Sequence, residues 1–299
     1  GRDHLGQRPR RRMAGNRTEG GTPHGTGKLT CVWSWINGTL APLDQGSVSI
    51  TDHGFTVGDG VFETLKIEHG IPFALTRHLR RLGRSAAGLA LPQPDEDLVR
   101  EAVAKVCAAQ PYELGVLRIT YTSGPGPLGS IRGDADCTLA VVSMPGKSWP
   151  ESTKAHVSQW PRNERSPLAG LKTTSYAENA VALAAAQAVG ASEALMCNLA
   201  GRLCEGTGSN VFVVLQGRVV TPPLTDGCLA GVTRGLVLDW FDVEERSLPL
   251  ATLQYADEVF LTSCTRDVHP VHAVDDRAIA QWPVTGGLRQ QFLERCAED

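Results

Sequence analysis

The chain has 299 residues, of which 41% are hydrophobic, and a formal net charge of −3 at pH 7. This length and composition indicate a globular protein with one large or two modest hydrophobic cores. No apolar run approaches the roughly 18 residues that span a bilayer, and the sequence shows no secretory signal, so we expect no membrane partner. The small negative charge gives no reason to expect nucleic acid as a partner.

Eight cysteines are scattered along the sequence without a Cys-x-x-Cys pair. They are Cys31, Cys107, Cys137, Cys197, Cys204, Cys228, Cys264 and Cys296. A disulfide framework or a zinc site usually shows regular, closely spaced cysteines. The pattern therefore favours reduced thiols in a cytoplasmic protein, with no bound metal.

Residues 1–30 are rich in Gly, Arg, Thr and Pro and include Arg10-Arg11-Arg12. They have no helical or strand period and little apolar content, which predicts a disordered arm. A second change in composition falls at residues 144–150, which read as a linker. We therefore expect a small N-terminal α+β domain over residues 31–146 and a larger C-terminal domain over residues 147–299.

The N-terminal half is predicted to combine strands with two helices. The pair Asn37-Gly38 between apolar runs predicts a hairpin, because both residue types accept the positive φ angles of a tight turn. Apolar residues at three- and four-residue steps predict a helix over 76–91, and a second helix is expected over 95–109, with Leu98, Ala102 and Val106 inward. Further strands are expected at 61–67, 115–122 and 137–143.

One acid in this half, Glu63, falls on the apolar side of its strand, with Val61 and Leu65. A carboxylate among apolar side chains is either paired structurally or part of a site, and both readings stay open.

The C-terminal half is also predicted to mix helices and strands without strict alternation, which favours an α+β fold over a doubly wound sheet. The expected strands are 154–160, 193–198, 211–215 and 257–262. The expected helices are 178–189, 231–240 and 287–296.

The stretch from Leu168 to Thr233 carries the chemistry. It places Lys172 among small residues, Glu205 before a glycine-rich turn, and Gly231-Val232-Thr233 at the start of a helix. A lysine can attach an aldehyde cofactor, an acid can keep a pyridine nitrogen protonated, and a helix N-terminus can bind phosphate. Together these features suggest a pyridoxal 5′-phosphate (PLP) site.

The ordered motifs resemble the class IV aminotransferase family, which includes branched-chain and D-amino-acid aminotransferases and aminodeoxychorismate lyases. The resemblance covers roughly Trp35 to the C-terminus. It rests on Asp59-Gly-Val-Phe-Glu-Thr, His78-x-x-Arg81-Leu, Lys172-Thr, Glu205-Gly-x-x-x-Asn and Gly231-Val-Thr. It implies a two-domain D-amino-acid aminotransferase-like fold that binds PLP, and a homodimer.

The resemblance also assigns roles to individual residues. Lys172 becomes the catalytic lysine, chosen from six lysines, and Glu205 the partner of the cofactor's ring nitrogen. Phosphate ligands are expected at Arg81, Val232 and Thr233. On Arg81 alone, a solvent-exposed helix face is the more common role for an arginine. The glycine-rich loop 123–133, which lacks the ending of a nucleotide-binding loop, is expected to face the substrate.

Two assignments are less specific. Tyr176 is the candidate for a hydrogen bond to the cofactor's phenolic oxygen, although its spacing from the lysine differs by one residue from that of branched-chain aminotransferases. The segment Thr262-Ser-Cys-Thr265 resembles a second phosphate-facing loop. Thr265 is the expected ligand there, but Cys264 aligns where relatives carry threonine, so the choice of hydroxyl stays open.

Two reactions fit these residues, and both act on a small amino-carboxylate substrate. Our preferred expectation is an aminodeoxychorismate lyase, which releases pyruvate and forms the folate precursor 4-aminobenzoate. Cations near the expected cleft, above all Arg162 and Arg165, could bind the second carboxylate of that substrate. The alternative is an aminotransferase for branched-chain or D-amino acids. A third reading is a non-catalytic binding protein, which Arg81, Lys172 and Glu205 together argue against.

Overall fold

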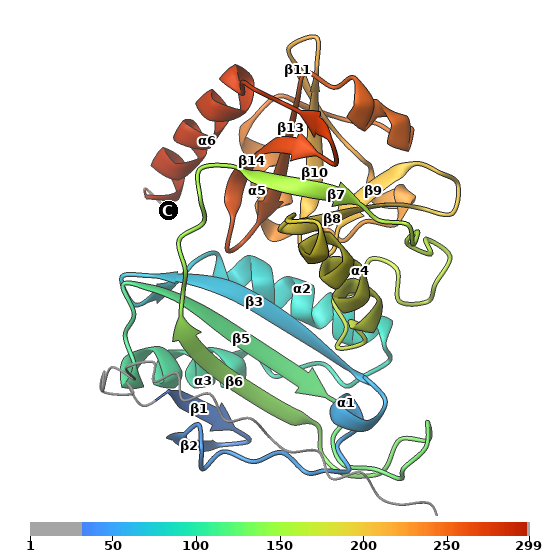
Figure 1. Cartoon of the computed structure of the whole chain (residues 1–299). Coiled ribbons are helices and arrows are strands. Elements are labelled where there is room, and N and C mark those ends of the chain that lie inside the picture. Colours follow the sequence, from blue (N-terminus) through green and yellow to red (C-terminus); the bar gives the residue numbers. More distant parts are fainter. Residues whose placement is uncertain (1–31, 298–299) are drawn as a thin grey trace, which may run out of the picture. The chain divides into compact units, whose positions relative to one another are not determined.

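The computed structural model describes residues 32–297. The predicted arm, residues 1–30, lies outside the described residues. Within the described part, the chain forms two β-sheets with helices packed against them (Figure 1). Hydrophobic side chains fill separate cores on these sheets.

The first sheet is antiparallel and has the strand order β2-β1-β6-β5-β3-β4. Its strands are β1 (Trp33–Ile36), β2 (Thr39–Pro42), β3 (Gly60–Glu68), β4 (Ile71–Pro72), β5 (Leu114–Thr122) and β6 (Thr138–Pro145). Its helices are α1 (His53–Thr56), α2 (Leu75–Gly88) and α3 (Glu96–Ala109). The nine residues of β3 pair with β5 along their whole length, so β3 is a central strand.

Local sequence explains much of this half. Asn37 and Gly38 have φ angles of 42° and 95°, and Ile36 pairs with Thr39, which confirms the predicted hairpin. Helix α3 begins where the Asp95 carboxylate accepts hydrogen bonds from the backbone N–H groups of Asp97 and Leu98.

The predicted inward face of α3 is wrong in one position. Leu98 is 39% exposed, and the neighbouring Val99 is fully buried instead. Ala102 and Val106 are buried as expected, and Val103 joins them. The observed stripe of Val99, Val103 and Val106 is a three- to four-residue repeat that places Leu98 at its edge.

The second sheet is mixed and has the strand order β12-β11-β10-β13-β14-β7-β8-β9, with β15 paired to β14. Its strands are β7 (Thr153–Val157), β8 (Glu193–Cys197), β9 (Leu203–Gly206), β10 (Asn210–Leu215), β11 (Arg218–Thr221), β12 (Val243–Glu245), β13 (Glu258–Ser263), β14 (Asp267–Val274) and β15 (Arg277–Ala278). Its helices are α4 (Ala177–Ala188), α5 (Val232–Trp240) and α6 (Pro283–Cys296), with 3-10 turns η1 (Leu224–Asp226) and η2 (Leu250–Gln254).

The α+β prediction is confirmed, because strand pairing in both sheets is largely antiparallel and the helices do not alternate strictly with strands. Helix α6 begins at Pro283, four residues before the expected 287, since proline suits the first turn of a helix. The division at residues 146 and 147 stays a prediction; it falls in the connection between β6 and β7.

Two further findings concern residues 32–297. No helix there is long and apolar enough to cross a membrane. In the same range, no group of three or more His, Cys, Asp or Glu side chains could hold a metal ion.

Candidate active site

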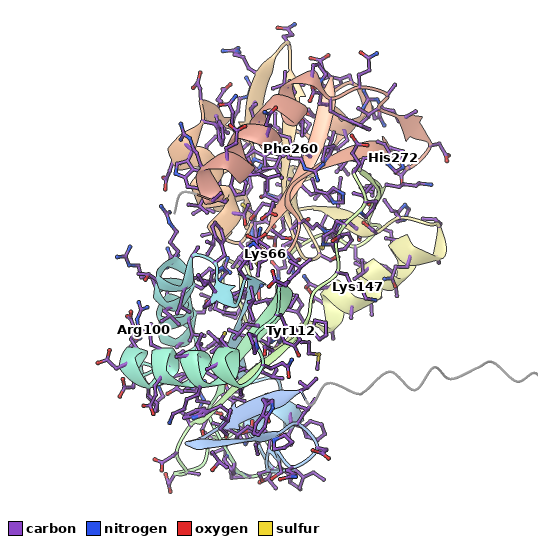
Figure 2. All side chains as sticks on the ribbon, turned by 90° about the vertical axis from the view of Figure 1, so that its left-hand side faces the viewer. Lys66, Arg100, Tyr112, Lys147, Phe260 and His272 are labelled. Carbon is purple, nitrogen blue, oxygen red and sulfur yellow. The ribbon has the colours of Figure 1, made fainter. Side chains whose placement is uncertain are left out.

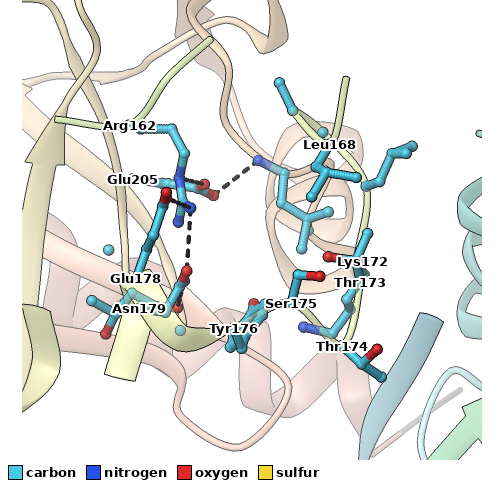
Figure 3. A pocket seen from close by; sticks show the side chains of 18 of the residues that line it. Arg162, Leu168, Lys172, Thr173, Thr174, Ser175, Tyr176, Glu178, Asn179 and Glu205 are labelled. Atoms are coloured by element: carbon cyan, nitrogen blue, oxygen red, sulfur yellow. Dashed lines mark hydrogen bonds and ion pairs between the residues drawn. The ribbon is translucent and has the colours of Figure 1, made fainter. Parts of the chain in front are cut away.

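A cavity of about 600 Å³ lies among segments of both sheets. Six of the seven predicted cofactor-binding residues line it: Arg81, Lys172, Tyr176, Glu205, Val232 and Thr233. Arg162 and Glu205 lie on one wall of this cavity, and the stretch from Lys172 to Thr174 lies on the opposite wall (Figure 3). The fold therefore brings together residues that are up to 152 positions apart in the sequence, from Arg81 to Thr233.

The backbone of Lys172 is held by the first sheet and its helix. Its N–H group donates to Ser85 Oγ of α2 at 3.1 Å, and its carbonyl oxygen accepts from the Phe62 N–H of β3 at 2.9 Å. Thr173 then forms an isolated antiparallel bridge with Val61. Leu171 packs closely on Gly88, where an added Cβ would lie 2.6 Å from a Leu171 methyl group. The lysine therefore starts from a fixed backbone.

The side chain of Lys172 lies in an aromatic and cationic environment. Its Nζ is 4.3 Å from the Phe62 ring centroid and 5.6 Å from that of Tyr176. Burial, together with the nearby charges of Arg81 and Arg118, lowers the pKa of Lys172 to about 8. Roughly a tenth of the amine is then neutral at pH 7, far more than for an ordinary lysine, and neutral amine is the form that attacks a carbonyl.

Glu205 faces the cavity from the end of β9 and is 8% exposed. Its Oε2 accepts the Leu229 N–H at 2.9 Å, and its Oε1 lies 3.2 Å from Arg162 Nε. Burial raises the pKa of Glu205, and the charge of Arg162 opposes that rise. Arg162 is in turn oriented by Asn179 Oδ1, which accepts from its Nη1 at 3.2 Å. The pair can keep an acid ionised inside a closed site.

Glu63 resolves the ambiguity left by the sequence. Its carboxylate accepts two hydrogen bonds from Arg81, from Nε at 2.8 Å and from Nη2 at 2.6 Å, and lies 2.7 Å from His78 Nδ1. Burial would raise its pKa, but Arg81 and His78 outweigh that effect and lower the pKa to about 2. Glu63 is therefore paired, and it fixes the guanidinium that lines the cavity.

Arg81 keeps donors free after these contacts. A guanidinium has five N–H donors. Glu63 uses two of them, and the Ala230 carbonyl accepts a third from Nη1 at 3.1 Å. The remaining N–H groups, one on Nη1 and one on Nη2, could bind an anion in the cavity, so Arg81 does not lie on the exposed face of its helix.

The start of α5 supplies the second part of an anion site. Unpaired N–H groups at a helix N-terminus attract anions, and Gly231 is the N-cap here. The buried Thr233 Oγ1 has no hydrogen-bond partner among the described residues. A Cβ at Gly231 would lie 2.0 Å from Asn210 Oδ1, so only glycine fits beside the asparagine of the Glu-Gly-x-x-x-Asn motif.

The expected ligand Thr265 is the exception. It does not line the cavity, whereas Thr262, Ser263 and Cys264 do. Thr262 lies at the end of β13, is 1% exposed, and its Oγ1 lacks a hydrogen-bond partner among residues 32–297. The structure therefore does not bring Thr265 to the cavity, and of the hydroxyls that the sequence left open Thr262 is the candidate that faces it.

Tyr176 immediately precedes α4 and its ring meets the Phe62 ring edge-on, with centroids 5.0 Å apart. Burial, and then the negative charge of Glu205, raises the pKa of Tyr176 to about 12, so its phenol stays protonated at neutral pH. The side chain lines the cavity. This agrees with the expected role toward a phenolic oxygen without testing it.

These observations fit PLP. The orphaned hydroxyls of Thr233 and Thr262, the α5 N-terminus and the free donors of Arg81 suit a phosphate at one end. Lys172 could reach an aldehyde, and Glu205 could face a ring nitrogen on the other side. All of these groups line one cavity of adequate size.

Several residues that shape the site were missed or left unassigned by sequence reasoning. Ser85, Asn179 and Asn210 act through neighbours, as described above. Glu193 does so too: its Oε1 accepts the Thr207 N–H at 2.9 Å and its Oε2 accepts from Ser209 Oγ at 2.8 Å, which fixes the turn after Glu205. For Glu193 and Asn210 the only available signal was a polar residue within an apolar strand, and that signal does not identify the partners of the residue.

Comparisons with known proteins agree with this geometry. Residues 60–274 match the family model described as amino-transferase class IV. The chain is 30% identical over 276 residues to a putative branched-chain-amino-acid aminotransferase of Methanocaldococcus jannaschii, covering 87% of this chain and 95% of that protein. It is 32% identical over 273 residues to the D-alanine aminotransferase of Bacillus licheniformis, covering 85% and 93%.

A solved structure gives the same result for the fold. The branched-chain aminotransferase of the archaeon Thermoproteus uzoniensis with norvaline superimposes with a TM-score of 0.84 at 26% identity, over 90% of this chain and 95% of that chain. The two-domain α+β fold expected from the sequence is thereby confirmed. PLP as the cofactor is confirmed by the family and by a similar branched-chain aminotransferase structure that contains pyridoxamine 5′-phosphate. The chain belongs to the class IV aminotransferase family of PLP-dependent enzymes.

Proposed function

We propose that this enzyme transfers the amino group of a branched-chain or D-amino acid to a 2-oxo acid. The observation that carries this choice over the lyase is the state of the cations around the cavity. A substrate with two carboxylates needs two available cationic groups, and the lyase hypothesis relied on Arg162 and Arg165 for them. Arg162 is occupied by Glu205, and Arg165 does not line the cavity.

Arg132 and His53, the other cationic candidates for a second carboxylate, are also engaged with other groups. Arg132 makes a two-pronged ion pair with Asp59, at 2.7 Å for both Nε and Nη2. His53 Nε2 lies 2.7 Å from the Pro127 carbonyl oxygen, and the ring does not line the cavity. A second buried carboxylate would thus lack a counter-ion, which is costly. These contacts support a substrate that presents one carboxylate near the reacting carbon.

Arg118 does not line the cavity either, but its charge acts on Lys172, which does line it, and this makes Arg118 our candidate for that single carboxylate. Its Nε donates to Thr120 Oγ1 at 3.4 Å, its guanidinium carbon lies 3.3 Å from the Phe62 ring centroid, and it has no carboxylate partner within residues 32–297. Burial lowers the pKa of Arg118 to about 10, so the group is still charged at neutral pH. Because the same Phe62 ring contacts Lys172, a carboxylate bound by Arg118 would hold the substrate close to the lysine.

The remaining residues have complementary tasks. When bound, PLP would supply an aldehyde carbon that takes up the substrate's amino group and a ring that withdraws electrons from the substrate's α-carbon. Lys172 attaches the cofactor and moves the proton at the substrate's α-carbon. Glu205, as a carboxylate, would accept a hydrogen bond from the protonated ring nitrogen, Tyr176 would donate toward the phenolic oxygen, and Arg81 with Thr233 would bind the phosphate.

The lyase remains the second candidate, because the Asp52-His-Gly-Phe and Lys172-x-x-x-Tyr176-x-x-Asn179 patterns favour it. One product assay separates the two. Without an oxo-acid acceptor, a lyase converts aminodeoxychorismate to equal amounts of pyruvate and 4-aminobenzoate. We expect neither product, and we expect glutamate when 2-oxoglutarate is supplied with a branched-chain L-amino acid or a D-amino acid. Equal pyruvate and 4-aminobenzoate would overturn the proposal.

We also propose that the enzyme is a cytoplasmic homodimer. Several large apolar side chains are exposed, and one of them, Phe55, lines the cavity, which supports an additional protein surface beside it. They are Ile50 at 78%, Phe55 at 74%, Leu128 at 81% and Ile131 at 78%. Light scattering of the eluting protein would give the mass in solution, and a monomer would refute the dimer.

A further inference from the structure

The turn that carries Thr262 is attached to the opposite sheet by a buried ion pair. Lys66 of β3 donates to both carboxylate oxygens of Asp267, at 2.9 and 2.8 Å from Nζ. The lysine side chain is 4% exposed and lies where the first sheet meets the second (Figure 2). Asp267 begins β14 and pairs with Ser263 across the turn. The ion pair therefore attaches the Asp267 end of the turn to β3, and the pairing with Ser263 connects it to the other end.

A second contact, made by a residue three positions before Asp267, also attaches the turn to β3. Cys264 Sγ lies 2.6 Å from the Thr64 carbonyl oxygen, also on β3. Thr64 and Lys66 lie on the same face of this strand as Phe62, because side chains alternate along a strand. One face of β3 thus contacts Lys172 at one end and the phosphate-facing turn at the other.

The two partners respond differently to burial: burial raises the pKa of Asp267, an effect that Lys66 opposes, whereas the pKa of Lys66 rises despite burial. Burial alone would lower the pKa of Lys66, but the carboxylates of Asp267 and Glu68 outweigh it and raise the pKa, so the ammonium stays charged. Glu68 Oε1 is 3.0 Å from the same Nζ but is 44% exposed, whereas Asp267 is 18% exposed. A less solvated partner interacts more strongly, so Asp267 is the main counter-ion.

We propose that Lys66 and Asp267 are positioning residues, which hold the turn Thr262–Asp267 so that Thr262 faces the phosphate of PLP. Neither residue lines the cavity, so both act through the turn. The proposal rests on the phosphate site formed by Arg81, Thr233 and Thr262. The expected consequence is specific: loss of the ion pair weakens recognition of the phosphate and leaves recognition of the pyridoxal ring unchanged.

The test compares two probes on cofactor-free protein, pyridoxal 5′-phosphate and pyridoxal, which lacks the phosphate. The dissociation constant of pyridoxal divided by that of pyridoxal 5′-phosphate gives the contribution of the phosphate to binding. A general loss of folding would raise both constants together and leave this ratio unchanged. For Asp267→Asn we expect the ratio to fall about threefold to thirtyfold, the range typical of changes transmitted through packed neighbours. Asparagine tolerates the positive φ of 53° at this position as aspartate does, so the substitution removes charge without backbone strain.

The chain offers matched variants. Glu68→Gln removes the exposed partner of the same ammonium and should leave the ratio within twofold of the wild type. Lys66→Met should lower the ratio as Asp267→Asn does, and it remains informative if an unpaired buried lysine prevents Asp267→Asn from folding. Lys66→Arg keeps the charge and should restore most of the wild-type ratio.

A further variant, Thr233→Ala, distinguishes failure of the positioning proposal from failure of the proposed phosphate site. Thr233→Ala should lower the ratio directly, because Thr233 belongs to the proposed phosphate site. If Thr233→Ala lowers it and neither Asp267→Asn nor Lys66→Met does, the ion pair is merely structural and the positioning proposal is overturned. If Thr233→Ala leaves the ratio unchanged, the phosphate site itself is misplaced.

Discussion

The Phe62 N–H group donates to the Lys172 carbonyl oxygen at 2.9 Å, while the Phe62 ring lies 4.3 Å below the ammonium of the same lysine. One residue of β3 therefore fixes both the backbone and the side chain of the proposed catalytic lysine. The opposite face of the strand presents Glu63, which holds Arg81. Because β3 is a central strand paired along its whole length, the lysine and the phosphate ligand share one rigid support.

The lowered pKa of Lys172 predicts how cofactor-free protein binds PLP at different pH values. The neutral amine attacks, so the rate of covalent attachment should rise about tenfold per unit below a pH of about 8 and level off above it. Stopped-flow absorbance measures this rate, and borohydride reduction with peptide mapping identifies the lysine. Lys154→Arg serves as a control that should change nothing. An adduct on any other lysine would refute the assignment.

Arg162 is predicted to act through the ionisation of Glu205. Arg162→Met removes the charge that opposes the effect of burial, so the pKa of Glu205 should rise further. The ring-nitrogen partner must be ionised, so turnover of the variant should fall at low pH and recover as pH increases. Glu205→Gln cannot ionise and should be slow, by orders of magnitude, at every pH. A kcat profile for Arg162→Met that matches the wild type would show that Glu205 does not depend on Arg162.

The sequence predicted the chemical centre better than its support. Lys172, Glu205 and the Gly231 helix start were identifiable because each is a short local motif with a physical reason for its residue types. Their partners were not, because Glu193 and Asn179 contact the site through chain reversals that periodicity does not encode.

The same limit explains two expectations that the contacts do not favour. Arg162 was interpreted as a substrate cation because sequence proximity to Lys172 does not reveal that Glu205 already binds it. The choice between the Thr262 and Thr265 hydroxyls stayed open because the exact end of β13 decides which of them faces the cavity, and strand ends are the least predictable feature of a sequence.

Arg81→Lys is predicted to weaken cofactor binding without loss of the fold. Lysine keeps a positive charge near Glu63 but lacks the planar set of donors that serves Glu63 and a phosphate together. The dissociation constant for PLP should rise about ten- to hundredfold, as expected for loss of a charge-assisted contact. Arg80→Lys, on the exposed face of the same helix, is the control. Equal dissociation constants for Arg81→Lys and the wild type would remove Arg81 from the phosphate site.

Arg118→Leu tests the proposed carboxylate contact of the substrate. Leucine can still pack on Phe62 but offers no donor, so kcat/KM should fall about ten- to a hundredfold for amino acids and for 2-oxo acids. A primary amine without a carboxylate provides the internal comparison, because its slow reaction should not depend on Arg118. The control Arg165→Leu removes an exposed arginine outside the cavity and should leave all three activities unchanged. If Arg118→Leu slows the amine as much as the amino acid, Arg118 supports Phe62 and Lys172 structurally. If only the amino and oxo acids are affected, the guanidinium binds the carboxylate.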